Sequence, residues 1–552
     1  MRPIALESRE IVISKLQQES FDIIVVGGGI TGVGIAQDAA SRGLKVALLE
    51  KGDYAIGTSS RSSKLIHGGL RYLAQGDFKV TYESCSERAL LQELAPHLVK
   101  PLSFLIPIYH WRHGLQIFAG LWVYDIISLV RNSEFHKRVD IPAMREIAPM
   151  LETTNLQLGY LYHDCQTNDA RLVIEVAKSA ASLGATLGNY LKVDQFIKDQ
   201  GKIVGVKAYD ELGQQTIEVR AKLVVNATGV WLDDLCQADR PDLPRKIRPA
   251  KGVHITIARE RIPTKHAMLF ESAAKDGRSV FFIPWYEGII IGTTDTDYQG
   301  SVENPQANDA DIDYILAAVN SVFPLAKLTR NDILSSYAGL RPLVDEGKHS
   351  TKDVSREHRI FESDSGLISI AGGKLTTYRL MAVQLMDHVA KRMQARGLMS
   401  QNHSSTTDKI YLSGLTSKDS LTALNTEVSQ QAQVLGIADD IAQHLVADYG
   451  ANAHKILAIV AETPALATVI LPHLPFIQAE VVYSVQYEQV NRIADFLVRR
   501  SRIALLTADQ GMSAATIVAQ LIGQAAHWDS NRQISELEHY KQLVGQYSKV
   551  CT

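Results

Sequence analysis

The pattern of hydrophobic and polar residues predicts alternating strands and helices in the first part of the chain. A buried strand, FDIIVV, is predicted from Phe21, followed by a helix over GGGITGVGIAQDAASRG and a second strand, LKVALLE, that ends at Glu50. Strand, helix and strand in this order make a βαβ unit. The preceding residues, 1–20, mix charged and apolar positions throughout, which favours a short lead-in helix over a targeting signal.

Four later apolar runs are also typical of strands. They lie at residues 222–229 (KLVVNATG), 278–285 (RSVFFIPW), 288–295 (GIIIGTTD) and 366–373 (GLISIAGG). Strands mixed with helices in this way predict an α/β fold that is interrupted by an antiparallel-sheet domain.

The character of the chain changes near residue 400. The segment SQNHSSTTD, residues 400–408, is polar and is predicted to be a linker. Beyond it the chain is rich in Ala, Leu, Gln and Ile at helical spacing, as in QAQVLGIADDIAQHLVADYG. We therefore expect a separate C-terminal helical domain over residues 401–552.

The longest apolar run, residues 115–130, has two interpretations. It contains Asp125 and has only 16 residues, fewer than the roughly 20 needed to cross a bilayer. One interpretation is a buried core helix. The other is an interfacial element over residues 111–131, with cationic residues at its ends and aromatic residues at a lipid boundary. These aromatic residues are Trp111, Phe118, Trp122 and Tyr124.

Composition and charge indicate a folded, near-neutral protein. The chain has 552 residues, 46% hydrophobic and 21% charged, and a formal net charge of -3, so nothing draws it as a whole towards nucleic acid. Its cysteines lie far apart and show neither a CxxC nor a compact disulfide spacing. We expect reduced thiols in a cytoplasmic protein, and we assign no metal site. The cysteines are Cys85, Cys165, Cys236 and Cys551.

Gly27, Gly29 and Gly32 have the GxGxxG spacing, directly after a strand and at the start of a helix. The first glycine permits a tight turn, the second lets the main chain approach a pyrophosphate, and the third lets helix and strand pack closely. The N-terminus of the helix offers free N–H groups to phosphates. Glu50, at the end of the second strand, can accept hydrogen bonds from ribose hydroxyls. The motif predicts a dinucleotide, without separating FAD from NAD.

The segment after Glu50 favours FAD. In place of another regular βα unit, the chain continues with GTSSRSSKLIHGGLRYL, residues 57–73, which is rich in hydroxyl groups. Two later segments, NATGVW near Gly229 and AGGKLTTYR at residues 371–379, contain small residues that allow the backbone to approach a cofactor closely.

Six ordered motifs resemble those of the FAD-dependent glycerol-3-phosphate dehydrogenase family, within the D-amino-acid-oxidase-like group of flavoproteins. They are VVGGGITGVGIAQDAASRGLKVALLEKGD, TSSRSSKLIHGGLRYL, VVNATGVW, IIIGTTDTDY, YAGLRPL and AGGKLTTYR. The resemblance covers residues 21–393. It resumes at residues 479–505, AEVVYSVQYEQVNRIADFLVRRSRIAL, which are similar to the helical cap of that family.

This resemblance implies a Rossmann-like FAD-binding domain, discontinuous over residues 21–400, with a substrate domain inserted at approximately residues 90–160 and 250–350. It implies FAD as cofactor and oxidation of sn-glycerol 3-phosphate to dihydroxyacetone phosphate, with electrons passing to a membrane quinone. It further implies a cytoplasmic protein held peripherally on the inner face of the cell membrane, which favours the interfacial interpretation of residues 111–131. The oligomeric state stays open, with a homodimer as one alternative.

The hydroxyl-rich segment is expected to follow the cofactor. Thr58, Ser59 and Ser60 can reach pyrophosphate or ribitol oxygens, while Ser62, Ser63 and Lys64 lie further along it. The full set of expected FAD contacts is Gly27, Gly29, Gly32, Glu50, Thr58, Ser59, Ser60, Ser62, Lys64, Gly229, Gly373, Lys374 and Thr376.

A phosphorylated secondary alcohol requires cations at one end of its site and a proton acceptor at the other. Arg341 stands between apolar residues and a proline in YAGLRPL, where a solvated arginine is unexpected, so the residues alone favour it as the phosphate ligand. The family pattern adds Arg356, which lies in a polar run, and Arg71 and Tyr72 on the substrate side. Lys374 resembles the family's lysine near the flavin ring, where a cation stabilises negative charge.

Two histidines are candidates for the proton acceptor, because the unperturbed pKa of histidine lies near working pH. His67 in LIHGGLRY precedes a Gly-Gly pair that lets the chain bend past a planar ring. His254 in AKGVHITI alternates with Val253 and Ile255 and should face away from them on a strand. The residues do not decide between the two, and Arg341 is the electrostatic partner in either case.

Three other functions share parts of this pattern. A glycerol-3-phosphate oxidase passes electrons to oxygen, but we expect such enzymes to carry an additional inserted segment that we do not find here. An amine- or amino-acid-oxidising flavoprotein needs a carboxylate clamp, a role that Arg341 could fill. A non-catalytic redox or ligand sensor is disfavoured by the number of polar groups expected around one ring.

Overall fold

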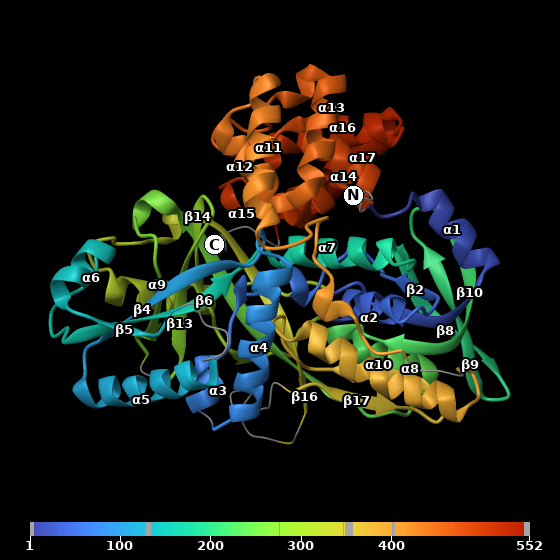
Figure 1. The fold of residues 1–552 in the computed structure, drawn as a ribbon, viewed down its shortest axis with the longest axis horizontal. Coiled ribbons are helices and arrows are strands. Elements are labelled where there is room, and N and C mark those ends of the chain that lie inside the picture. The colour runs from blue at the N-terminus through green and yellow to red at the C-terminus, as the bar shows by residue number, and fades with distance from the viewer. Residues whose placement is uncertain are drawn as a thin grey trace.

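Two β-sheets and a group of C-terminal helices make up the fold of the computed structural model (Figure 1). The structure describes residues 5–74, 76–128, 134–274, 276–345, 347, 357–399 and 403–545. The sheets lie beside each other along the long axis of the molecule, and the C-terminal helices gather on one side of them (Figure 1).

The first sheet contains the predicted βαβ unit. Its strand order is β17-β18-β10-β1-β2-β7, with β9 and β8 continuing from β10 as an antiparallel extension. β1 runs parallel to both β10 and β2, so the predicted strands near Phe21 and Glu50 are neighbours. Among the described residues its strands are β1 Ser20–Val26, β2 Val46–Leu49, β7 Thr186–Gly188, β8 Leu191–Asp199, β9 Lys202–Asp210, β10 Gln215–Asn226, β17 Arg359–Glu362 and β18 Leu367–Ala371.

The second sheet is mostly antiparallel. Its order is β15-β11-β14-β13-β12-β4-β6-β3, with β16 paired to β11 and β5 to β6. Its strands in the described parts are β3 Leu65–Ile66, β4 Lys100–Ile108, β5 Lys137–Val139, β6 Leu158–Gln166, β11 Ile247–Ala258, β12 Ala267–Glu271, β13 Ser279–Trp285, β14 Gly288–Gly292, β15 Thr296–Asp297 and β16 Ile333–Val344. The four later apolar runs are thus confirmed as strand-forming, in β10, β13, β14 and β18.

Helices cover the sheets and form the C-terminal domain. Those up to residue 399 are α1 Arg9–Gln18, α2 Ile30–Ser41, α3 Leu70–Ala74, α4 Phe78–Leu94, α5 Trp111–Ser128, α6 Ile141–Ile147, α7 Asp169–Ser182, α8 Leu232–Asp239, α9 Asp309–Val322 and α10 Tyr378–Ala395. Those that follow are α11 Ser420–Val434, α12 Asp439–Tyr449, α13 Ala453–Glu462, α14 Gln478–Glu488, α15 Ile503–Leu506, α16 Met512–Ala525 and α17 Ser530–Val544. The predicted lead-in helix is confirmed as α1.

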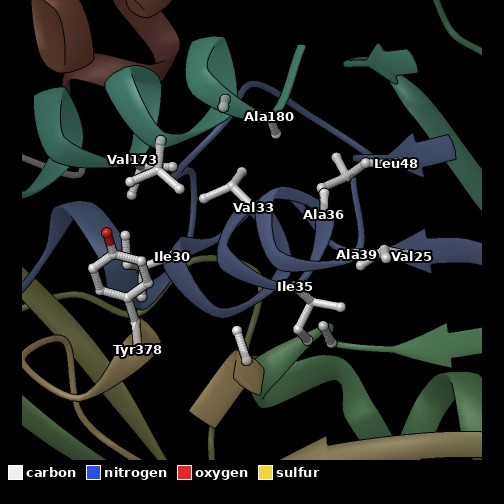
Figure 2. Close-up of a cluster of buried hydrophobic side chains, with 14 of the residues drawn as sticks. Val25, Ile30, Val33, Ile35, Ala36, Ala39, Leu48, Val173, Ala180 and Tyr378 are labelled. Carbon is white, nitrogen blue, oxygen red and sulfur yellow. The ribbon is translucent and has the colours of Figure 1, made fainter. Parts of the chain in front are cut away.

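The core of the first domain forms around α2. This helix lies between α7 and α10 and against β1 and β2, and its small and branched side chains fill the space between them (Figure 2). A Cβ at Gly34 would lie only 2.8 Å from a ring carbon of Tyr378, so the glycine lets α10 pack directly on α2. The strands beneath are apolar from Ile23 to the end of β1 and throughout β2, as expected of parallel strands covered on both faces.

The C-terminal helices are joined to the first domain by buried ion pairs. Asp53, which is fully buried, accepts two hydrogen bonds from Arg500, at 2.8 and 2.9 Å, and a third from Arg499. Burial raises the pKa of Asp53, but the two guanidinium groups lower it further, and the net shift is downward. The arginines belong to a π-helical turn, Asp495–Arg500, and a second buried pair joins Arg171 of α7 to Glu488 of α14.

Helix α5 has one buried face and one exposed apolar face. Leu121 and Tyr124 are fully buried, while Trp111, Leu115 and Trp122 expose between 46% and 60% of their surface. The interpretation of this run as a buried core helix is therefore wrong for half of the helix. The placement of Tyr124 at a lipid boundary is also wrong, because its hydroxyl donates a 2.7 Å hydrogen bond to the buried Asp164. No helix in the described parts of the chain combines the length and apolar character that a membrane span requires.

Candidate functional site

The glycine-rich turn between β1 and α2 brings backbone segments into direct contact. Gly27 has a φ of +112°, and a Cβ there would lie 2.6 Å from the carbonyl oxygen of Ala227 at the end of β10. A Cβ on Gly32 would lie 1.9 Å from the carbonyl oxygen of Gly27. Only glycine fits at either position. β1, α2 and β10 can meet here because glycine has no side chain.

A cavity of about 460 Å³ opens beside this turn. Its volume lies within the range typical of small-molecule sites, roughly 300–1,000 Å³. Nine of the predicted cofactor residues line it: Gly27, Gly29, Glu50, Thr58, Ser59, Ser62, Gly229, Gly373 and Lys374. The other four, Gly32, Ser60, Lys64 and Thr376, lie outside that lining.

Glu50 is held rigidly at the edge of the cavity. Its carboxylate accepts hydrogen bonds from the backbone N–H groups of Gly28, at 2.5 Å, and Gly52, at 2.9 Å. Burial nevertheless raises the pKa of Glu50, with the backbone N–H groups acting against that shift. A glycine turn, a helix N-terminus and a carboxylate at the end of the next strand are the donor set that a dinucleotide needs, so the residues present fit FAD.

Several of the predicted hydroxyl groups also form hydrogen bonds within the protein. Ser59 Oγ accepts the N–H of Ile30 at 2.9 Å and so caps the start of α2. Thr58 donates to the carbonyl oxygen of Leu340 at 2.6 Å, which ties the segment to β16. Ser62 donates to Asp169 at 2.7 Å. The segment is thus fixed to three different elements while it borders the cavity.

Lys64 lies in a buried ion pair. Its Nζ lies 2.6 Å from both Asp169 Oδ1 and the carbonyl oxygen of Ser60, and only 2% of the residue is exposed. Sequence analysis missed Asp169, the first residue of α7. The helix start was detectable from the Asn168-Asp169 pair, since Asn168 is its N-cap, but the pairing with Lys64 was not.

The bend after His67 is anchored on both sides. The N–H of His67 donates to Thr376 Oγ1 at 3.1 Å, and the N–H of Gly68 is shared between Tyr124 Oη and Asp164 Oδ1, both at 3.1 Å. Burial lowers the pKa of His67 to about 4, although Asp164 acts in the opposite direction. Tyr124 and Asp164 are further residues that sequence analysis missed at this site.

His254 lies on β11, and its two ring nitrogens differ in their hydrogen bonding. Its Nε2 is 2.9 Å from Ser63 Oγ, and its ring stacks on Tyr337 at 4.9 Å between centroids. Its Nδ1 is buried and has no hydrogen-bond partner among the described residues. Burial, with Arg341 and Lys64, lowers the pKa of His254 to about 3, so the ring is neutral at working pH.

The predicted cations lie in two groups. Arg341 on β16 contacts Thr293 Oγ1 at 3.2 Å and Asp295 Oδ1 at 3.4 Å, and a Cβ on Gly252 would lie 2.6 Å from its Nη2. Lys374 lies 3.4 Å from the ring centroid of Tyr72 and donates to a serine of α4 at 3.1 Å.

Two predicted substrate residues are only partly described or not described at all. Arg356 lies outside the described residues, and of Arg71 the structure gives the backbone, in α3, without the side chain.

Known proteins resemble this chain over nearly its whole length. Residues 22–379 match the family described as FAD dependent oxidoreductase, and residues 405–533 match the C-terminal domain of alpha-glycerophosphate oxidase. A glycerol-3-phosphate dehydrogenase of Mycobacterium leprae is 37% identical over 540 residues, 98% of this chain and 90% of that relative. An aerobic glycerol-3-phosphate dehydrogenase of Bacillus subtilis is 36% identical over 97% of each chain.

A solved structure shares the fold from end to end. The glycerol-3-phosphate dehydrogenase from Bacillus halodurans, determined by X-ray crystallography in complex with FAD, matches with a TM-score of 0.83 and 34% identity. The match covers 100% of this chain and 99% of that one. The predicted fold class, an α/β FAD-binding domain with an inserted sheet domain and a C-terminal helical domain, is confirmed.

The neutral state of His254 makes stability depend on pH. In the unfolded chain its pKa is about 6.5, so unfolding takes up a proton between that pH and the folded value of about 3. Stability should therefore fall as the pH drops below about 6.5. His254→Gln should reduce the number of protons taken up on unfolding near pH 5 by about one per molecule. Unfolding midpoints of the FAD-loaded protein between pH 5 and 7.5 test this. The exposed His403 serves as the matched control, and equal pH dependence of His254→Gln and His403→Gln would contradict the prediction.

Proposed function

This chain belongs to the family of FAD-dependent oxidoreductases, with FAD as its cofactor, and within it we propose that the protein oxidises sn-glycerol 3-phosphate to dihydroxyacetone phosphate. The observation that carries this proposal is that Arg341 and the buried His254 lie on two paired strands, β16 and β11. A fixed cation and a histidine on neighbouring strands suit a phosphorylated alcohol. The near full-length relatives that are named glycerol-3-phosphate dehydrogenases support the same substrate.

FAD, when bound, supplies the acceptor for the hydride that leaves the secondary carbon. In our proposal Arg341 binds the substrate phosphate through charge-assisted hydrogen bonds, together with Arg356. Arg71 and Tyr72 complete the substrate side. Lys374 supplies the positive charge that stabilises the reduced cofactor.

We propose His254 as the group that accepts the alcohol proton. Its Nδ1 is buried and has no hydrogen-bond partner in the described part of the chain, its Nε2 lies 2.9 Å from Ser63 Oγ, and Arg341 acts on its pKa. A neutral imidazole with a free nitrogen is able to take a proton. His67 instead shapes the bend at Gly68 that borders the site.

The cofactor contacts follow the cavity. We propose that the pyrophosphate of FAD lies at the N-terminus of α2 beside Gly29, and that Glu50 binds the adenosine ribose. Lys64, with Asp169, then positions the hydroxyl-rich segment and does not contact FAD directly.

Replacing Arg341 tests the substrate. Glycerol 3-phosphate should bleach the flavin absorbance of the wild-type protein. Arg341→Met should raise the concentration of glycerol 3-phosphate needed for half of the bleaching by about 30-fold or more, because the phosphate loses a charged partner. FAD should stay bound. Arg392→Met, which removes an exposed arginine of α10, is the matched control and should behave like the wild type. Loss of FAD from Arg341→Met, or bleaching by an amino acid in place of glycerol 3-phosphate, would refute the proposal.

We further propose a membrane quinone as the electron acceptor, with glycerol-3-phosphate oxidation by oxygen as the alternative. The expected result is little hydrogen peroxide per substrate oxidised in air, and a large rise in turnover when a soluble quinone analogue is added. Oxygen and quinone analogue are compared on the same preparation. Stoichiometric peroxide without any response to the quinone analogue would establish the oxidase instead.

A quinone in the bilayer requires contact with the membrane, and we propose that the exposed face of α5 makes it. This face presents Trp111, Leu115, Trp122 and Ile126 together, each at least 46% exposed. Aromatic and aliphatic side chains on one helix face are suited to the interface of a bilayer. In this proposal the protein lies on the cytoplasmic side of the membrane, held peripherally.

Placing charges on this face tests the docking surface. Leu115→Glu with Trp122→Glu should release the protein from vesicles, because charged groups are costly at the lipid boundary, while activity with a soluble dye is retained. Co-sedimentation with vesicles is the measurement. The control is Ile534→Glu, which changes a residue with 61% exposure on α17. Unchanged sedimentation of the α5 variant would exclude this surface.

A further inference from the structure

A second, smaller cavity lies apart from the cofactor cavity and shares none of its lining residues. Its volume is about 160 Å³, and it opens where β4 begins and β6 ends. Its lining residues include Lys100, Gln166, Thr167, Arg259, Lys265 and Tyr286. They come from β4 and β6, the turn after β6, the segment that follows β11, and the turn between β13 and β14.

Three cationic side chains border this small space. Lys100 is partly buried, and its ammonium group has no hydrogen-bond or ion-pair partner among the described residues. Arg259 donates one N–H to the carbonyl oxygen of Tyr286 at 2.7 Å, and Lys265 is exposed at the rim. A partly buried ammonium group without a counter-ion is unfavourable, so the cavity favours an anion.

The carboxylate that acts on the pKa of Lys100 is already neutralised by another cation. Asp448, which acts on the pKa of Lys100, forms an ion pair with the buried Arg502 and accepts a hydrogen bond from the Tyr286 hydroxyl at 3.4 Å. The balance of charge around the cavity therefore stays positive. Lys100 also borders a larger polar cavity of about 890 Å³ beneath α11 and α12, so the two spaces adjoin at this lysine.

From these observations we propose that this cavity is a binding site for a phosphate group, either inorganic phosphate or a small phosphomonoester. Lys100, Arg259 and Lys265 supply the opposite charge that a dianion requires. The site is separate from the proposed substrate site at Arg341. It does not depend on which alcohol the enzyme oxidises.

Equilibrium dialysis of the FAD-loaded protein with labelled inorganic phosphate tests the proposal. Lys265→Met and Lys100→Met should each weaken one class of phosphate sites about 10-fold, since each removes a charge-assisted contact. Lys391→Met, which removes an exposed lysine of α10, should leave binding unchanged. A parallel titration with glycerol 2-phosphate distinguishes a phosphomonoester from inorganic phosphate as the ligand. The ligand that binds this class of sites more tightly is the better match. Identical phosphate binding in all three variants and the wild type would overturn the proposal.

Discussion

The direct contact between Gly27 and Gly32 is the constraint on which the rest of the structure depends. Any side chain at Gly32 would collide with the Gly27 carbonyl, so β1 and α2 can meet at this short distance only with glycine at both positions. Their closeness sets the N-terminus of α2 at the mouth of the cofactor cavity and aligns Glu50, on the neighbouring strand, with it. The second sheet carries His254 on β11 and Arg341 on β16, two strands that pair with each other.

The site combines cations with neutral histidines, and burial determines which groups are charged. Arginine keeps its charge in nearly any protein environment, whereas a buried imidazole loses its proton. The same burial that keeps His254 neutral leaves its Nδ1 without a hydrogen-bond partner among the described residues. The N–H of Gly68 donates to Tyr124 on the inner side of α5, so the helix with the exposed apolar face also contacts the bend after His67.

The βαβ unit, four further strands and the C-terminal helices could be predicted because each depends on residues close together in sequence. The failures have physical reasons. The run at residues 115–130 is apolar on both faces of α5, so hydrophobicity alone could not tell the covered face from the exposed one. Lys64 pairs with Asp169 and Asp53 with Arg500, over separations of 105 and 447 residues. Such pairs depend on the tertiary fold, and nothing in the local sequence signals them.

The buried pairs between Asp53 and the two arginines make the helical domain part of a single cooperative structure. A shortened protein ending before residue 403 would leave the Asp53 carboxylate without Arg499 and Arg500, and would leave Arg171 on α7 without Glu488. Removing one side of a buried ion pair typically costs about 3–5 kcal/mol. Hydrolysis of a peptide bond between residues 399 and 403 would therefore leave the two fragments associated. The nicked protein would be held together by the buried ion pairs.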